Sequence, residues 1–347
     1  MTGRQPARQQ RRPLGLIVYG SMILLTLLYT VAIAAPWVAP YDHTEQNRTL
    51  PDCPPSSIRF NSPPYWNESI LFTHPQRLAD PIDRSYTQDD TVRVPVRFLY
   101  NGHLFTTAQD DPKFFLLGTD SLGRDLFSRI VYGSRISLSI GVVGVLISFA
   151  IGTLVGSFAG YSGGWIDDIA MRIVEVEMSL PSFYFLLALA AVIPPNLSSA
   201  ATFFVIVALM SFINWAYFAR VIRGMAASLR EGEYVVAARA LGATRWRIII
   251  RHVVPGTLSY TIIAATLSIP RFILGESALS LLGLGIQEPD ASWGKLLADA
   301  QNVQHLVRHP WILMPGVFIF VTIMAFNFVG DYLRDRLDPR ATAGNAG

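Results

Sequence analysis

The sequence predicts an all-α polytopic membrane protein with six transmembrane helices and a partly β insertion after the first helix. Only 15% of its 347 residues are charged and 51% are apolar, whereas an average soluble domain has roughly 25% charged residues. A helix that spans a bilayer needs about 20 apolar residues. Uncharged runs of that kind cover 13–41, 136–166, 178–219 and 310–330, and the run 253–287 contains only two charges, Arg271 and Glu276.

These runs predict spans at 16–38, 136–159, 175–193, 200–220, 257–280 and 311–331. The run 178–219 is long enough for two helices, and Pro194-Pro195-Asn196 separates them. The third span has a short apolar stretch, so we expect its helix to begin earlier, through Arg172, Glu175 and Glu177. Pro181 is the expected position of a kink, because proline removes a helix hydrogen bond.

The distribution of arginine predicts the orientation, since loops rich in Lys and Arg stay in the cytoplasm. The first twelve residues contain four arginines and no acid, and residues 220–251 contain seven arginines. Six spans place both segments and both termini on the cytoplasmic side of the membrane. The apolar stretch 14–39 is longer than the roughly 7–15 residues of a signal-peptide core, so we expect a retained first helix.

The remaining organisation follows from the segments between spans. We expect a cytoplasmic tail and first helix at 1–39, an external insertion with an interfacial helix at 40–134, five helices at 135–332 and a cytoplasmic tail at 333–347. Asn101-Gly102 follows an alternating run and indicates a β-hairpin, although an ordered linker remains an alternative. The interfacial helix is expected to expose Arg124, Asp125, Ser128 and Arg129 opposite Leu126, Phe127, Ile130 and Val131.

Several kinds of chemistry are not expected. The only Gly-Lys pair, Gly294-Lys295, precedes Leu296 and therefore cannot complete a phosphate-binding loop. One cysteine cannot form a disulfide framework within the chain. His305 and His309 could share a helix face as metal ligands, but without an evident third ligand we expect solvated histidines and no metal site. The net charge of +3 reflects membrane topology, and no nucleic-acid partner is expected.

Residues 233–255, between the fourth and fifth spans, form the most informative segment. Tyr234, Ala237, Ala238 and Leu241 have spacings that share one helix face. Gly242 is expected to end this helix in a left-handed conformation, and Thr244 is expected to cap the next one. From the residues alone, the segment either docks on another protein or lies on anionic lipid headgroups.

This segment resembles the EAA loop of permease subunits of bacterial ABC importers. The matching positions hold Val236, Ala237, Ala238, Gly242, His252, Val254 and Pro255, so the alanines, the glycine and the proline agree, while Val236 replaces the glutamate. Four further stretches resemble the dipeptide, oligopeptide and nickel branch of this family: LGTDSLGRDLFSRIVYGSRISL, FAGYSGGWIDD, ESALSLLGL and FNFVGDYLRDRLDPR.

The resemblance implies a type I ABC importer permease fold, a location in a bacterial inner membrane and a non-catalytic role. The implied partners are a second homologous permease subunit, two ATPase subunits that hold ATP and Mg²⁺, an external substrate-binding protein and membrane lipid, with no cofactor in this chain. Ala237, Ala238, Gly242 and Ala243 are the expected close contacts with the ATPase, with Glu233 and Arg239 as polar partners. Peptides are the expected cargo; nickel or another small solute is the alternative.

Two other classes of membrane protein fit the sequence less well. An ion-coupled secondary transporter often shows inverted repeats, which this sequence lacks, and a membrane-tethered enzyme would need a catalytic set in residues 40–120, where none is evident. Ionisable and amide groups at membrane depth are candidate functional residues. They are Arg271, Glu276, Asn214 and Asn327, which could face the pathway, contact the partner permease or pair helices within the chain.

Overall fold

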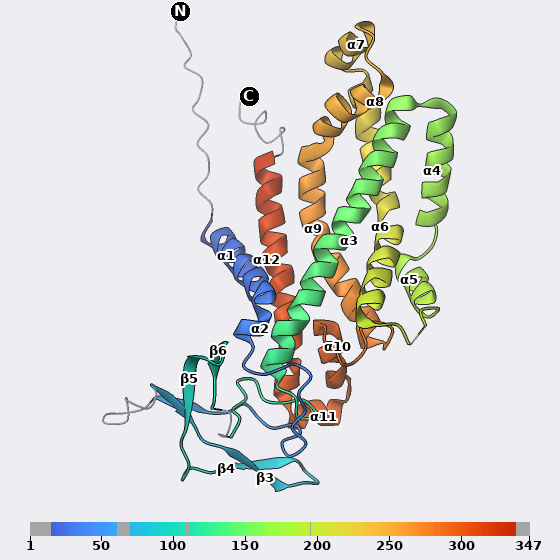
Figure 1. Ribbon diagram of the computed structural model, residues 1–347. Coiled ribbons are helices and arrows are strands. Elements are labelled where there is room, and N and C mark those ends of the chain that lie inside the picture. Colours follow the sequence, from blue (N-terminus) through green and yellow to red (C-terminus); the bar gives the residue numbers. More distant parts are fainter. Residues whose placement is uncertain (1–14, 61–69, 109–111, 195, 338–347) are drawn as a thin grey trace, which may run out of the picture.

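The computed structural model describes residues 15–60, 70–108, 112–194 and 196–337. Helices form an elongated bundle, and short strands cover one end of it (Figure 1). In the described ranges, five helices are long and apolar enough to cross a membrane, and a bent pair would add a sixth. The predicted fold class is therefore confirmed, with the strands in the insertion.

The five long helices are α1 (Leu16–Ile33), α3 (Leu126–Ser162), α6 (Ser199–Arg230), α9 (Val254–Leu281) and α12 (Met314–Leu337). Helices α3 and α6 pack closely along their length through Gly152, Gly156 and Gly160. A Cβ at any of these glycines would overlap backbone atoms of α6. Small residues at every fourth position let two membrane helices approach closely, so this stripe positions α6 and the loop that follows it.

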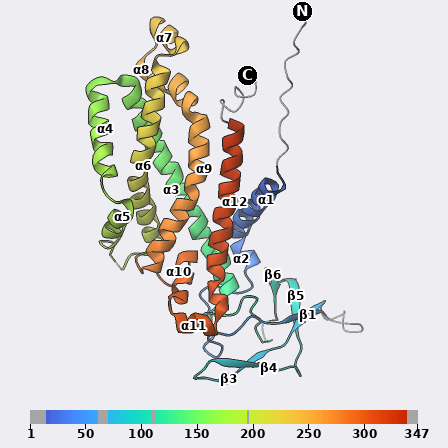
Figure 2. The ribbon, with the colours of Figure 1, turned by 180° about the vertical axis from the view of Figure 1, so that it is seen from behind.

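The third span is a broken one. Helix α4 (Gly164–Met178) and helix α5 (Ser182–Ala190) are bent by 80° at the break that contains Pro181, and both lie beside α6 in the two opposite views (Figure 2). Helix α4 begins at Gly164 and contains Arg172, Glu175 and Glu177, so the expected early start is confirmed, although it lies further from residue 175 than predicted. Its first turn is held to α6 because the Arg223 guanidinium donates to Asp167, with 2.8 Å between Nε and Oδ1.

The expected interfacial helix before the second span is not a separate element. Helix α3 begins at Leu126 and continues without a break to Ser162, with Asp125 as its N-cap, which accepts the Ser128 amide at 2.8 Å. The side expected to face water is buried, and the Arg129 side chain is only 1% exposed. The prediction was wrong because these polar groups find partners inside the protein.

The strands form two small antiparallel sheets. One has the order β1-β2-β5-β6 and the other pairs β3 with β4. Their bounds are β1 (Ile58–Phe60), β2 (Leu71–Thr73), β3 (Gln76–Asp80), β4 (Ser85–Gln88), β5 (Val94–Tyr100) and β6 (His103–Thr106). Tyr100 pairs with His103, and Asn101 and Gly102 between them have φ of 49° and 80°. The predicted Asn-Gly hairpin is confirmed, because both turn residues tolerate positive φ.

Short helices complete the strand end of the bundle. They are α2 (Ala35–Val38), α10 (Trp293–Leu297) and α11 (Val303–Arg308), with 3₁₀ turns η3 (Ala298–Gln301) and η4 (Pro310–Leu313). The indole of Trp293 is fully buried and donates from Nε1 to the Ile130 carbonyl at 3.0 Å. The loop between α9 and α12 is thereby fixed to the start of α3.

Candidate functional site: the α7–α8 loop

The segment between α6 and α9 forms helix α7 (Glu233–Ala240), helix α8 (Arg245–Ile248) and a π-helical turn, η2 (Ile249–Val253). It projects from the end of the bundle opposite the strands (Figure 1). Gly242 has φ of 81°, and the Ala243 amide donates back to the Ala238 carbonyl at 3.1 Å. The Thr244 hydroxyl accepts the Arg247 amide at 3.4 Å. The predicted helix, turn and cap are therefore all present.

One side of α7 is anchored to the bundle. Val235 is 0% exposed and packs in an apolar cluster with Tyr161 at the end of α3 and Ala226 of α6. The cluster also contains Ile248, Ile249 and Val253. The Arg239 guanidinium lies 5.6 Å from the centroid of the Tyr161 ring, a cation–π distance. Because its anchors come from α3, α6 and η2, a force on α7 is passed to three parts of the bundle.

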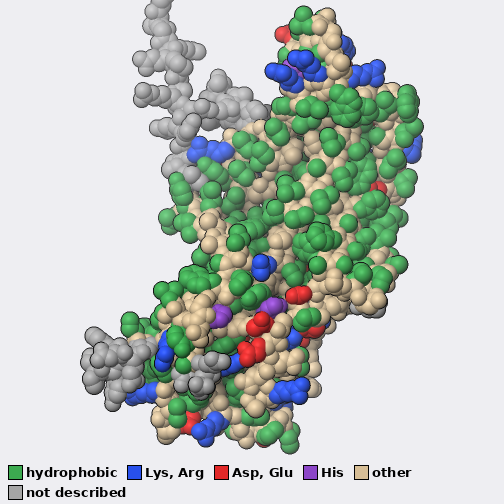
Figure 3. Space-filling model, viewed as in Figure 1, with side chains coloured by type: hydrophobic (Ala, Val, Ile, Leu, Met, Phe, Trp, Pro, Cys, Tyr) green, Lys and Arg blue, Asp and Glu red, His purple; other side chains and the backbone are tan. Residues whose placement is uncertain are grey.

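The other side of the loop is exposed and partly apolar. Leu241 is 89% exposed and Trp246 is 57% exposed, and Tyr234, Val236 and Ile250 are also exposed. No atom of the described residues lies within 4 Å of a Cβ placed on Gly242. Arginine side chains gather at this end of the molecule, beyond the broad apolar surface of the helices (Figure 3). This face combines large apolar groups, small residues and positive charge.

The residues that the sequence singled out divide between the two sides. Glu233, Ala237, Arg239 and Gly242 are exposed, whereas Ala238 and Ala243 are half-buried and pack against the cluster around Val235. Sequence reasoning did not identify Val235 as the anchor or Trp246 as part of the exposed face. The signal for Val235 was weak, since Val236 beside it is equally apolar.

The polar residues at membrane depth have different surroundings. Arg271 is exposed on α9, and Asn327 is half-buried on α12. Asn214 is half-buried and donates to the Met210 carbonyl of its own helix at 2.7 Å.

Glu276 is fully buried within the chain. Its carboxylate accepts the Ser280 hydroxyl at 2.7 Å and the Ser137 hydroxyl of α3 at 3.4 Å. The Ser137 hydroxyl accepts the Trp293 amide at 3.0 Å, and the Ser280 hydroxyl accepts the Ile286 amide at 3.3 Å. This carboxylate therefore joins α9, α3 and the following loop inside the protein.

A buried ion network joins the start of α3 to the loop after α9. Asp120 accepts from Arg124 Nε at 2.7 Å and from Arg129 Nη1 at 2.6 Å. Both guanidiniums also donate to Glu288, which is half-exposed, with Arg124 Nη1 at 2.5 Å from Oε2. Sequence reasoning had expected these arginines on a water-facing side and missed the network, because Glu288 lies more than 150 residues away.

The two histidines of α11 and the turn after it also differ from expectation. His309 is 5% exposed and His305 is partly buried, so the expectation of solvated histidines was wrong. Their rings lie 4.9 Å apart, centroid to centroid. The carboxylate of Asp52 approaches both from the insertion, a contact that spans 253 residues of sequence for His305.

These features define a multi-pass membrane protein that displays a structured, anchored loop at one end. Residues 152–343, more than half of the chain, match the family described as the binding-protein-dependent transport system inner membrane component. Residues 17–64 match the family described as the N-terminal TM domain of oligopeptide transport permease C. The chain belongs to the first of these families.

The chain is also similar to several named proteins. The chain is 41% identical over 228 residues to the oligopeptide transport system permease protein OppC of Haemophilus influenzae, covering 65% of this chain and 71% of the relative. It is 44% identical over 224 residues to the dipeptide transport system permease protein DppC of Bacillus subtilis, covering 64% and 68%. A structure of the MetNI methionine ABC transporter aligns with 61% of this chain and 98% of its own, at 16% identity and a TM-score of 0.47.

Proposed function

We propose that this chain is one of two permease subunits of an ATP-driven, binding-protein-dependent importer of di- and oligopeptides. It forms half of the translocation pathway and hydrolyses no ATP itself. Two separate ATPase subunits bind ATP with Mg²⁺, and an external binding protein delivers the peptide. Family membership and the names of the relatives support this proposal.

The single observation that carries the coupling role is the two-sided loop. Ala237, Leu241 and Gly242 are exposed on one side of the loop, and a Cβ on Gly242 would meet no neighbouring side chain among the described residues. The buried side of the loop, through Val235, connects the exposed side to α3 and α6. A ligand shifts a conformational equilibrium only by its differential affinity for the two states. If the closed and open ATPase pairs bind α7 with different affinity in the two conformations, ATP-driven closure shifts the bundle between its inward-open and outward-open forms.

We assign the contacts as follows. Ala237, Ala238, Gly242 and Ala243 form the region of close approach, and Glu233 and Arg239 supply polar contacts at its edge. Arg239 is exposed while its guanidinium lies on the Tyr161 ring, so its contact with the ATPase would bear directly on the end of α3.

The proposed orientation places α7 in the cytoplasm and the strands outside. The start of α1 and the end of α12 both lie toward the α7 end of the bundle (Figure 1), which supports the proposal that both chain termini are cytoplasmic. The arginine-rich loop then satisfies the positive-inside rule. The strands and α11 face the binding protein.

Reconstitution tests the proposal. Vesicles that contain this chain, its partner permease and the ATPase subunits should accumulate labelled peptide only with the loaded binding protein outside and ATP inside. Vesicles that contain this chain alone should accumulate none. Uptake of Ni²⁺ without peptide would favour the small-solute alternative, and uptake by this chain alone under an ion gradient would contradict the proposal.

A further inference from the structure

Three groups that suit a metal ion converge where the strand region meets α11. Asp52 precedes the strands, and His305 and His309 lie on α11 and at its end. One ligand atom from each lies within 4.8 Å of the other two. His305 Nε2 and Asp52 Oδ1 lie 2.9 Å apart.

The three side chains are enclosed. The Asp52 carboxylate is 0% exposed and the His305 side chain 19% exposed. His309 is 5% exposed, and its Nδ1 is buried without a hydrogen-bond partner among the residues that the structure describes. Buried polar atoms are normally paired, so an orphaned imidazole nitrogen beside two other ligand groups needs an explanation.

The surroundings hold the groups in place. The Asp52 amide donates to the Asp120 carbonyl at 2.9 Å, and its second carboxylate oxygen accepts from Arg84. His305 Nε2 donates to Asp52 at 2.9 Å, and Nδ1 faces the Asp299 carbonyl at 3.5 Å. A metal ion would replace the proton on Nε2, while Nδ1 kept its proton toward the carbonyl. Partners of this kind orient the ligands of metal sites.

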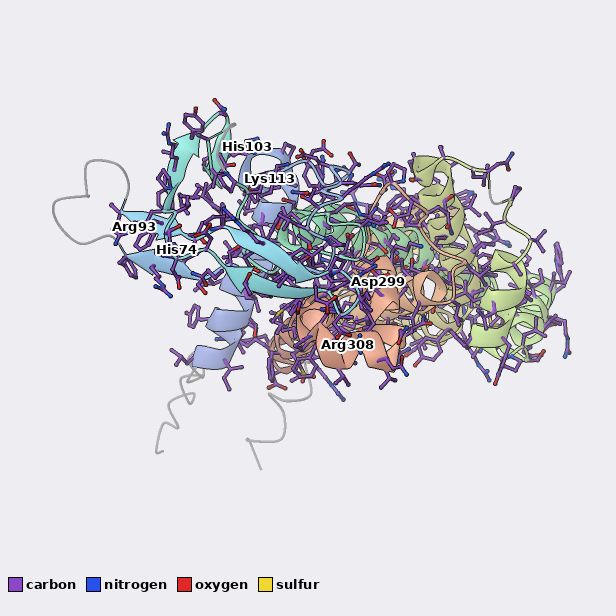
Figure 4. The ribbon with its side chains drawn as sticks, turned by 90° about the horizontal axis from the view of Figure 1, so that it is seen from below. His74, Arg93, His103, Lys113, Asp299 and Arg308 are labelled. Atoms are coloured by element: carbon purple, nitrogen blue, oxygen red, sulfur yellow. The ribbon has the colours of Figure 1, made fainter. Side chains whose placement is uncertain are left out.

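Figure 4 shows the strand end of the molecule, with Asp299 and Arg308 labelled. Asp299 and Arg308 lie on the side where the helical part meets the strands, and His103 lies well away from them. Arg308 makes an ion pair with Asp83 at 3.4 Å, so α11 also contacts the turn between β3 and β4. A metal ion here would tie the insertion to the loop before α12.

We propose that Asp52, His305 and His309 bind a divalent transition-metal ion, with Zn²⁺ as the best fit. Two imidazoles and one carboxylate favour zinc over Ca²⁺ or Mg²⁺, which prefer oxygen ligands. Zinc bonds of roughly 2.0–2.2 Å place tetrahedral ligand atoms about 3.3 Å apart. The pair His305 and Asp52 must therefore open slightly from 2.9 Å, and a pair as far apart as 4.8 Å must close by about 1.5 Å to reach that spacing. Water fills the fourth position.

The test measures Zn²⁺ binding by the full-length chain, purified through a tag without histidine and stripped with a chelator. Titration against a chromophoric zinc chelator should show one tight equivalent per chain. His309→Gln and His305→Gln should each weaken binding by at least about 10-fold, since loss of even an outer-shell partner costs roughly 10–100-fold. The matched control is His103→Gln, whose ring contacts the Ala39 carbonyl outside the cluster; it should bind zinc like the parent.

Thermal unfolding gives a second readout, because a ligand that binds only the folded state stabilises it. Zinc, but not Mg²⁺, should raise the unfolding temperature of the parent and of His103→Gln, and should raise that of His309→Gln by clearly less at the same zinc concentration. If His309→Gln does not fold, the zinc titration of the parent protein is the deciding measurement. Absence of a tight equivalent in the parent, or equal affinity in all variants, would overturn the site. The inference does not depend on the proposed transport function.

Discussion

Gly242→Asn isolates the contact that the coupling proposal requires. Gly242 has φ of 81°, and asparagine is among the few residues that adopt this conformation readily. A left-handed residue costs roughly 1–2 kcal/mol for most side chains and less for asparagine. The added side chain meets no described atom within 4 Å of its Cβ. The isolated subunit should therefore lose less than about 1 kcal/mol of stability.

The docked complex should respond differently. If the ATPase approaches the Gly242 backbone closely, the new side chain overfills a packed interface, which typically costs about 1–3 kcal/mol. Each 1.4 kcal/mol is a factor of about ten, so ATPase affinity should fall roughly 5- to 150-fold. Gly242→Asp adds a buried charge and should abolish stimulation altogether while leaving membrane insertion intact.

The assay is ATP hydrolysis in nanodiscs, stimulated by loaded binding protein and measured across ATPase concentrations. Gly283→Asn is the matched control, because Gly283 ends α9 with φ of 78°, has open space around its Cβ and precedes an amide that donates to Leu279. The control should keep normal stimulation. Normal stimulation by Gly242→Asn as well would refute close approach at this turn.

Three further outcomes are expected. Val235→Ala removes two buried methyl groups and should destabilise α7 by about 2 kcal/mol, which would appear as roughly 30-fold faster amide hydrogen exchange in α7. The control Val236→Ala changes the exposed neighbour and should alter exchange little. Equal exchange rates in the two variants would show that Val235 does not anchor α7. Burial raises the pKa of Asp125 from 3.8 to about 6. The Asp125 carboxyl group holds its proton more tightly in the folded protein than in the unfolded chain. Its contribution to folding stability is therefore complete below pH 3.8 and is lost as the pH rises to about 6. Asp125→Asn should flatten the unfolding temperature over that window, and an unchanged slope would contradict the assignment. Burial also raises the pKa of the Cys53 thiol to about 12, so maleimide should label it slowly until the protein is unfolded; rapid labelling of native protein would show that the thiol is accessible.

The sequence alone predicted the features that depend on local preferences: the spans, one β-turn and one helix end. Charge-free runs predict the spans because the bilayer excludes charge, and the Asn101-Gly102 turn and the Gly242 helix end follow from backbone preferences of single residues. The position of residues 233–255 between two spans could be predicted from the order of the apolar runs along the chain. These features depend on neighbours within a few residues.

The tertiary structure alone decided which polar groups are buried and with what. Arg129 lies on the helix side expected to face water, yet Asp120 and Glu288 enclose it. The carboxylate of Asp52 reaches His305 across 253 residues of sequence. Periodicity shows that a residue lies on a helix face but not which distant segment covers that face. Packing of the whole chain determines the partner, and with it whether a charge meets water, another charge or a metal ion.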